Sequence, residues 1–251
     1  MQTIAICYWG MTRSINYTYK SHIQKLYTIL KNSNINYDIF MHTWKTENNI
    51  IWEKDCNVPI DYNEYKLLNP NYYQIDMQQD FLNSIIFEDY FNKKIYEEYG
   101  DNPNGEWRPQ LILNHLCALE SQKRVFNMVI ESKNEYDLIL YIRPDVEIMN
   151  NFDVNWLNID FDIMIPDYDN FEGLNDRFAI LPFKKALKYS TRINEIIEFR
   201  KNNGRIVSEK YVKYIVSKYY SNVKTINYIM QIIRPVLIND KNKDKLLGKK
   251  Q

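Results

Sequence analysis

Apolar residues follow two kinds of pattern along the chain, and together these patterns predict alternating strands and helices. Residues 3–9 form a compact apolar run that ends at Gly10, which is typical of a buried strand followed by a turn. Apolar residues then recur at helical spacing from Ile15 to Leu30. A second apolar run covers residues 37–44. This order of strand, helix and strand predicts a βαβ unit with parallel strands.

The same mixture continues after residue 70. Residues 137–143 form an unbroken apolar run, as expected for a strand buried on both faces of a parallel sheet. Pro109 suits the first turn of a long helix before that strand. Further strands are expected at 72–75, 161–166 and 177–181, and strands or extended segments at 223–230 and 232–238. Further helices are expected to begin near Asp61 and to cover residues 81–95 (with Asp80 as cap), 183–199 and 208–220.

No internal repeat or long linker divides the chain. The pattern therefore predicts one α/β domain over residues 1–239. The last residues, 240–251, are rich in lysine and lack an apolar face, so we expect a flexible tail there.

Charge and composition narrow the class of protein. Lys and Arg total 32, as do Asp and Glu, so the net charge of zero does not favour a nucleic-acid partner. No stretch approaches the roughly 20 apolar residues that span a membrane, and the first residues resemble a strand more than a signal peptide. The three cysteines are far apart, form no metal pattern and indicate a reducing compartment such as the cytoplasm.

Two acidic residues follow the buried strand at 137–143. Open α/β sheets bind ligands beyond the carboxyl ends of their strands, and residues i and i+2 of an extended chain point the same way. We therefore expect Asp145 and Glu147 to present two carboxylates to one spot. Mg²⁺ or Mn²⁺ takes such oxygen ligands and can bridge a diphosphate. The alternative is that both acids are solvated loop residues, paired with Arg143.

Other polar residues are expected at the same edge of the sheet. Gly10 and Arg13 lie between the first strand and the first helix, where backbone N–H groups favour anions. Arg13 either contacts a bound diphosphate or nucleotide, or is a surface residue at a turn. The second strand ends in His42, Thr43 and Trp44, and Trp44 either stacks on a base or packs in the core.

Four further patterns occur in order along the chain. They are residues 4–14 with Gly-Met-Thr-Arg, 37–44 ending in His-Thr-Trp, 136–145 ending in Arg-Pro-Asp, and 175–180 with Asp-Arg-Phe-Ala. These segments resemble, in the expected order, motifs of a family of GT-A type glycosyltransferases found in bacterial surface-polysaccharide loci and in large DNA viruses, and Ser208-Glu209-Lys210 is a weaker fifth match. The sequence departs from the family at Asp145-Val146-Glu147, which replaces Asp-x-Asp, and at Leu181-Pro182, where a glycine often follows.

The resemblance implies a GT-A like fold with a mainly parallel, mixed sheet between helices. It implies a hexosyl- or pentosyltransferase that moves a sugar from a nucleotide-sugar donor to a hydroxyl of a saccharide acceptor, assisted by Mn²⁺ or Mg²⁺, in the cytoplasm of the host if the chain is viral. The alternative is a non-catalytic nucleotide- or glycan-binding module on the same fold. Gly-x-Gly-x-x-Gly and Gly-Lys-[Ser/Thr] motifs are absent, which argues against dehydrogenases, methyltransferases and P-loop kinases.

The resemblance also suggests roles for individual residues. An inverting transferase needs a carboxylate that accepts the proton of the acceptor hydroxyl, for which we choose Asp176 first and Glu209 second. Alternatively, Asp176 caps a helix or pairs with Arg177, and Glu209 is an acid at a helix N-terminus, where the helix dipole stabilises negative charge. The expected donor-binding residues are Gly10, Arg13, His42, Thr43, Trp44, Arg143 and Asp145, the metal ligands are Asp145 and Glu147, and the acceptor-binding residues are Asp169 and Glu172.

Overall fold

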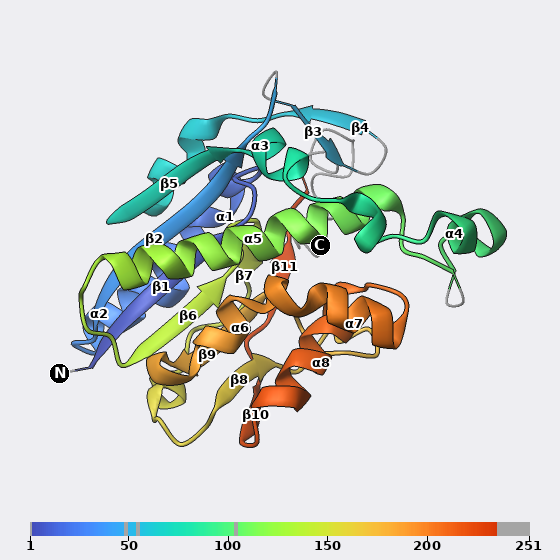
Figure 1. Cartoon of the computed structure of the whole chain (residues 1–251). Coiled ribbons are helices and arrows are strands. Elements are labelled where there is room, and N and C mark those ends of the chain that lie inside the picture. Colours follow the sequence, from blue (N-terminus) through green and yellow to red (C-terminus); the bar gives the residue numbers. More distant parts are fainter. Residues whose placement is uncertain (1, 48–49, 54–55, 103–104, 235–251) are drawn as a thin grey trace, which may run out of the picture.

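A seven-stranded mixed sheet forms the centre of the computed structural model, which describes residues 2–47, 50–53, 56–102 and 105–234 (Figure 1). The strand order is β10-β8-β9-β6-β1-β2-β5. β9 runs antiparallel to β6 and β8, and the other neighbours are parallel. The predicted α/β class with a mainly parallel, mixed sheet is thus confirmed. The strands are β1 (Thr3–Trp9), β2 (Asn36–Lys45), β5 (Tyr72–Met77), β6 (Leu138–Ile142), β8 (Ile163–Pro166), β9 (Phe178–Pro182) and β10 (Val223–Ile226).

Helices cover both faces of the sheet because side chains of each strand alternate between two cores. In β1 the odd-numbered residues from Ala5 to Trp9 pack in one core, and the even-numbered residues from Ile4 to Tyr8 pack in the other. The first core is covered by α5 (Pro109–Glu131), α6 (Leu187–Ser190), α7 (Ile196–Asn203) and α8 (Ser208–Tyr219). The second is covered by α1 (Ile15–His22), the π-helix η1 (Ile23–Tyr27) and α2 (Thr28–Asn32).

Two small sheets complete the described part of the chain. β7 (Val146–Ile148) pairs antiparallel with β11 (Met230–Ile232) just beyond the end of β6. β3 (Ile50–Glu53) and β4 (Cys56–Pro59) pair antiparallel between β2 and β5 in the chain. The pairing of β7 with β11 matters for the site, because it brings the late chain beside the segment that follows β6.

Two of the expected helices are broken into short pieces. The helix expected over 81–95 is instead α3 (Gln78–Asn83), the 3-10 helix η4 (Phe87–Asp89) and α4 (Lys93–Tyr99), and Asp80 lies inside α3. The helix expected over 183–199 is divided into η6 (Phe183–Lys185), α6, η7 (Arg192–Glu195) and α7. Near both breaks a hydroxyl and the backbone N–H of the same residue donate to one carbonyl. Ser84 donates in this way to Phe81, Ser190 to Ala186 and Thr191 to Leu187.

A helix begins at Asp61 as predicted, but it is the 3-10 helix η3 (Tyr62–Leu68). Glu64, in its first turn, accepts a hydrogen bond from the backbone of Asn16. The predicted tail at 240–251 lies outside the described residues. None of the described helices is long and apolar enough to cross a membrane.

Candidate active site

A cavity of about 860 Å³ lies beyond the carboxyl ends of β1 and β6. Its walls come from the turns after these two strands, the segment before β9, the first turn of α8 and the first half of α5. The cavity brings together seven of the predicted site residues, which are Gly10, Arg13, Trp44, Arg143, Asp145, Asp176 and Glu209. Five others do not line it, namely His42, Thr43, Glu147, Asp169 and Glu172.

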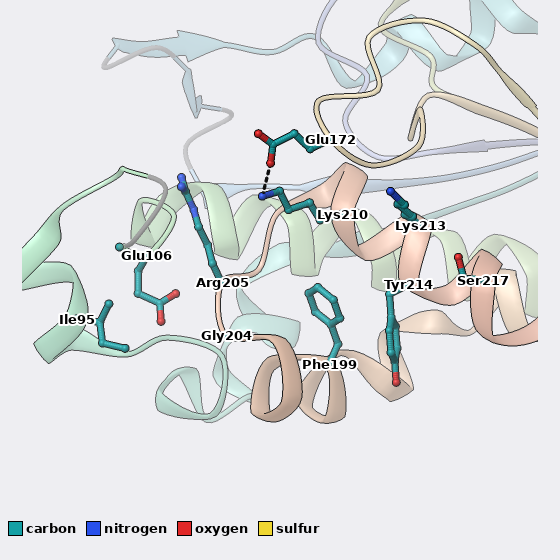
Figure 2. Close-up of a pocket in the computed structure, with 11 residues that line it drawn as sticks. Ile95, Glu106, Glu172, Phe199, Gly204, Arg205, Lys210, Lys213, Tyr214 and Ser217 are labelled. Atoms are coloured by element: carbon teal, nitrogen blue, oxygen red, sulfur yellow. Dashed lines mark ion pairs between the residues drawn. The ribbon is translucent and has the colours of Figure 1, made fainter.

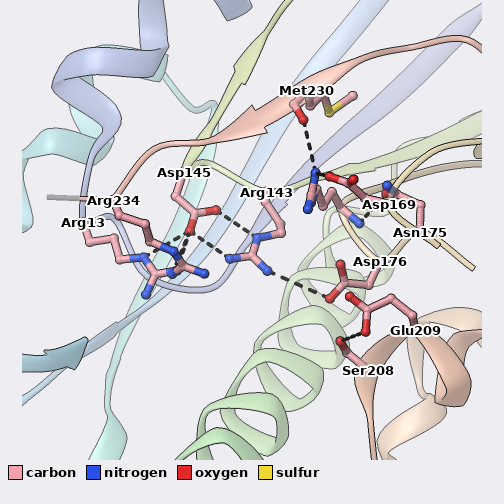
Figure 3. A network of polar contacts seen from close by, with 11 residues as sticks. Arg13, Arg143, Asp145, Asp169, Asn175, Asp176, Ser208, Glu209, Met230 and Arg234 are labelled. Atoms are coloured by element: carbon pink, nitrogen blue, oxygen red, sulfur yellow. Dashed lines mark hydrogen bonds and ion pairs between the residues drawn. The ribbon is translucent and has the colours of Figure 1, made fainter. Parts of the chain in front are cut away.

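Asp145 is the centre of a cluster of guanidinium groups (Figure 3). Arg13 donates to Asp145 Oδ2 through Nε and Nη2 at 3.0 and 2.6 Å. Arg143 donates to both carboxylate oxygens, at 2.9 and 2.8 Å. Arg234 Nη1 lies 3.9 Å from Oδ2. These three arginines come from the turn after β1, the end of β6 and the segment after β11. Because all three approach the carboxylate of Asp145, we call them the arginine cluster.

The charges of the cluster determine the ionisation of Asp145. The residue is only 2% exposed, and burial acts to raise the pKa of its carboxyl group. The guanidinium charges of Arg143 and Arg13 outweigh burial and bring the pKa down to about 2. Asp145 is therefore an anion at neutral pH that partly neutralises the cluster around it.

Two side chains of helix α1 contact the backbone on either side of Asp145. The hydroxyl of Thr18 donates to the carbonyl of Pro144 at 2.7 Å, and His22 Nε2 lies 2.8 Å from the carbonyl of Val146. Because a carbonyl only accepts, His22 Nε2 carries the proton and Nδ1 accepts from the hydroxyl of Tyr8 at 2.9 Å. Burial lowers the pKa of His22 to about 4, so the imidazole is neutral. These supporting residues had not been singled out from the sequence, where His22 is one member of a helical stripe.

The described residues do not form the predicted metal site. Pro144 and Asp145 lie in a turn, so the rule that residues i and i+2 point the same way does not apply to Asp145 and Glu147. Glu147 lies on β7 opposite Gln231 and does not line the cavity. Within the described chain, no three His, Cys, Asp or Glu side chains are grouped to hold a metal ion.

The chemistry of the donor set also disagrees with a divalent cation at Asp145. Both carboxylate oxygens already accept hydrogen bonds from guanidinium groups. A cation beside Asp145 would stand close to these positive charges, and each unit charge within about 4 Å costs roughly 4 kcal/mol at an effective dielectric constant of about 20. The residues present therefore fit an anion better than a metal ion, and the interpretation of Asp145 as a partner of Arg143 matches the observed contacts.

A pair of carboxylates lies on the other side of Arg143. Asp176 Oδ2 is 4.0 Å from Arg143 Nη1, and Figure 3 shows Glu209 beside Asp176. Burial and the nearby charge of Asp176 raise the pKa of Glu209. The hydroxyl of Ser208 donates to Glu209 Oε2 at 2.7 Å. The pair thus combines an ion-paired carboxylate with one whose affinity for a proton is increased, as general acid–base chemistry requires.

The residues at the end of β2 are buried rather than directed at the cavity. His42 is fully buried, its Nδ1 lies 2.7 Å from the hydroxyl of Ser121, and burial lowers its pKa to about 4. The same hydroxyl accepts the backbone N–H of Gly10, whose φ of +101° favours glycine, so His42 supports the turn after β1. Trp44 is 1% exposed and donates its indole N–H to the carbonyl of Cys117. Its role is packing beside the cavity.

The predicted acceptor residues lie in one strained loop. Asp169 and Glu172 have positive φ angles of 49° and 66°. Asp169 forms an ion pair with Arg177 at 2.6 Å, so Arg177 is not the partner of Asp176 that was considered as an alternative. Glu172 pairs with Lys210 at 2.6 Å. It lines a second cavity, of about 600 Å³, which lies against α7 and α8 (Figure 2).

Gly173 fixes this loop against the first turn of α8. A Cβ atom at Gly173 would lie 2.1 Å from the backbone carbonyl of Glu209, while the N–H of Leu174 donates to that carbonyl at 3.0 Å. We expect Gly173→Ala to lower the free energy of unfolding by about 1–3 kcal/mol, as overpacking does, and to reduce turnover because Glu209 must move. Urea titration and a transfer assay measure the two effects. Gly204→Ala, strained by its φ of +76° but with open space around it, is the control that should lose stability and keep turnover.

Three lining residues had no sequence signal that pointed to the cavity. Arg234 follows β11 and reaches Asp145 only because β11 pairs with β7. The indole Nε1 of Trp9 and the imidazole Nε2 of His115 are buried at the cavity wall with no hydrogen-bond partner among the described residues.

Known proteins provide similarity in fold but none in sequence. No protein-family profile matches the sequence, and no curated protein matches it. The galactosyltransferase LgtC, solved with donor and acceptor sugar analogues, is 10% identical over 89% of this chain and 73% of its own, with a TM-score of 0.42. A glycosyltransferase involved in glycosylation of the major capsid of PBCV-1 is 8% identical over 90% of this chain and 83% of its own, with a TM-score of 0.42.

A further similar structure is the glycosyltransferase GlyE of Streptococcus pneumoniae TIGR4. It is 11% identical, with a TM-score of 0.39, and the match covers 90% of this chain but 45% of that one. In fold, the chain is similar to these glycosyltransferases. At identities this low, a likeness concerns the fold, and the activity has to follow from the residues of the site itself.

Proposed function

We propose that the chain is a glycosyltransferase that moves a sugar from a nucleotide-sugar donor to a hydroxyl group of a saccharide acceptor. One observation supports this function above the others. The same cavity contains the arginine cluster and the carboxylate pair Asp176–Glu209. Arg143 links the two groups, because it pairs with Asp145 at the centre of the cluster and lies 4.0 Å from Asp176. Transfer from a nucleotide sugar needs these two ends, one for the anionic leaving group and one for the proton of the acceptor.

The arginine cluster is the proposed diphosphate end. Guanidinium groups are always charged at neutral pH and donate paired hydrogen bonds to phosphate oxygens. Positive groups fixed at the leaving oxygen stabilise the charge that develops as the bond to the sugar breaks.

The carboxylate pair is the proposed proton-accepting end. In an inverting transfer the acceptor oxygen forms a bond to the anomeric carbon, while the bond from that carbon to the diphosphate oxygen breaks and its electron pair leaves with the diphosphate. The hydroxyl proton passes to a carboxylate. We assign this role to Glu209 rather than to Asp176, our first choice from the sequence, because the raised pKa of Glu209 makes it the stronger base.

The carboxylate pair also favours an enzyme over a binding module on the same fold. A saccharide-binding module has no need of an acid whose pKa is raised by burial and by a second acid beside it, whereas active sites commonly contain such pairs. The alternative function therefore accounts for the cavity but gives the carboxylate pair no role.

A thermal-shift screen of nucleotide sugars and nucleoside diphosphates tests the proposal. A ligand at about 100 times its Kd adds roughly 2.7 kcal/mol to the free energy of unfolding, which raises the Tm of a chain of this size by about 5–10 °C. We expect at least one nucleotide sugar and its diphosphate to do so, and the matching nucleoside monophosphate to do less. A screen without any shift, run both in EDTA and in Mn²⁺, would refute donor binding.

A further inference from the structure

We propose that Arg13, Arg143 and Arg234 hold the donor diphosphate directly, without a divalent metal ion, and that Asp145 is a positioning residue that aligns the three guanidinium groups. The inference rests on the proposed function, because it names the groups that bind the leaving diphosphate. It departs from the expectation of a metal at Asp145 and Glu147, and the reason for the departure is the donor set described above.

The charge of the cluster is opposite to that of its proposed ligand. Three guanidinium charges surround the carboxylate of Asp145, and Asp176 is a second carboxylate 4.0 Å from Arg143, so the cluster keeps a net positive charge. The diphosphate of a nucleotide sugar is a doubly charged anion. A metal ion would add two more positive charges to a place that already has an excess, while the diphosphate neutralises that excess.

The cluster is held by contacts that reach across the whole chain, so its arrangement is built into the fold. The backbone N–H of Ile233 donates to the carbonyl of Asp145 at 2.9 Å, and the hydroxyl of Ser14 donates to the carbonyl of Ile233 at 2.9 Å. These bonds join the neighbours of Arg13 and Arg234 to the turn that carries Asp145. Figure 3 shows the side chains of Arg13 and Arg234 side by side at this carboxylate.

Asp145 has the geometry of an aligning group. Its carboxylate accepts two hydrogen bonds from Arg13 and two from Arg143, which fixes the planes of both guanidinium groups. Each guanidinium carries five N–H groups in a rigid fork, and all three arginines line the cavity.

Calorimetry with pyrophosphate as the probe, on the full chain in EDTA, tests the inference. We expect pyrophosphate to bind without metal, and Arg13→Ala and Arg234→Ala each to raise its Kd about tenfold or more, as loss of a charged hydrogen bond does. Lys93→Ala, which removes an exposed charge on α4 far from the cluster, should leave the Kd within about twofold.

Asp145→Asn separates the two possible roles of this residue by whether binding survives without metal. As a positioning residue, its loss removes hydrogen bonds that align the guanidinium groups but none of their charges, so pyrophosphate still binds in EDTA to the folded variant, less tightly than to the wild type. As a metal ligand, its loss abolishes binding of a nucleoside diphosphate with Mn²⁺. Should this variant not fold, the two arginine variants still decide the matter.

The outcomes also distinguish the inference from the proposed function. Binding that occurs only with Mn²⁺ and disappears in Asp145→Asn would overturn the metal-free site while leaving a donor-binding transferase intact. Binding in EDTA that neither arginine variant weakens would overturn the role of the cluster. If neither pyrophosphate nor any nucleoside diphosphate binds in either condition, both the inference and the proposed function are wrong.

Discussion

Glu209→Gln lowers kcat by about 10²–10⁴-fold and leaves donor affinity nearly unchanged, if Glu209 takes the proton of the acceptor hydroxyl. The amide keeps the shape of the side chain and its contact with Ser208 but cannot accept the proton. Steady-state kinetics together with calorimetry of the nucleoside diphosphate separate the two quantities. Glu172→Gln is the matched control, because Glu172 lies outside the main cavity and should leave kcat as it is.

The neighbouring acid provides a second, independent test through the pH dependence. The charge of Asp176 helps to raise the pKa of Glu209, so Asp176→Asn removes a like charge and lowers that pKa. Activity requires ionised Glu209 and falls as the pH drops through its pKa. The acidic limb of the profile should therefore move to lower pH in Asp176→Asn. A loss of turnover in Asp176→Asn as large as that expected for Glu209→Gln, with the limb unmoved, would make Asp176 the base.

Asp145→Asn lowers the free energy of unfolding at neutral pH by roughly 2 to 4 kcal/mol. The lower figure is the stability that corresponds to the lowered pKa of Asp145, and the upper figure is typical of a buried ion pair that loses one partner. The carboxylate is nearly fully buried among guanidinium groups, and the variant leaves their charges without a counter-charge. Urea denaturation measures the loss. Asp169→Asn, which removes an exposed partner of Arg177, should cost less than about 1 kcal/mol.

The pH dependence of this stability follows from the direction of the shift. The pKa of Asp145 is about 2 in the folded chain and near 3.9 in an unfolded one. Because the folded value is the lower one, the contribution is fully present above about pH 4 and is lost as the pH falls toward 2. The difference in stability between the wild type and Asp145→Asn should shrink over that window. A difference that stays constant would contradict the assigned ionisation.

Much of the site could be predicted because it depends on local sequence and on the rule for parallel sheets. The apolar runs of β1 and β6 identify buried strands, and parallel strands end at the same edge. Gly10, Arg13, Arg143 and Asp145 directly follow those strands, so their meeting at one cavity follows from the order of elements.

Other outcomes depended on contacts between distant parts of the chain. His42 lies near the end of β2 as expected, but its ring nitrogens lie against Ser121 of α5 and Asp76 of β5, and it does not line the cavity. The helix expected over 183–199 is divided into η6, α6, η7 and α7. Neither outcome can be read from apolar spacing, which does not say where a polar side chain finds its partner.

The sequence by itself determined the α/β order and the edge at which polar residues gather, because buried strands and amphipathic helices are encoded in nearby residues. Only the tertiary structure decided what Asp145 binds. Its partners Arg13 and Arg234 lie 132 and 89 positions away along the chain, and Arg234 arrives through the pairing of β11 with β7. Whether a carboxylate meets a metal ion or a guanidinium depends on which charges surround it in space, and that arrangement exists only in the folded chain.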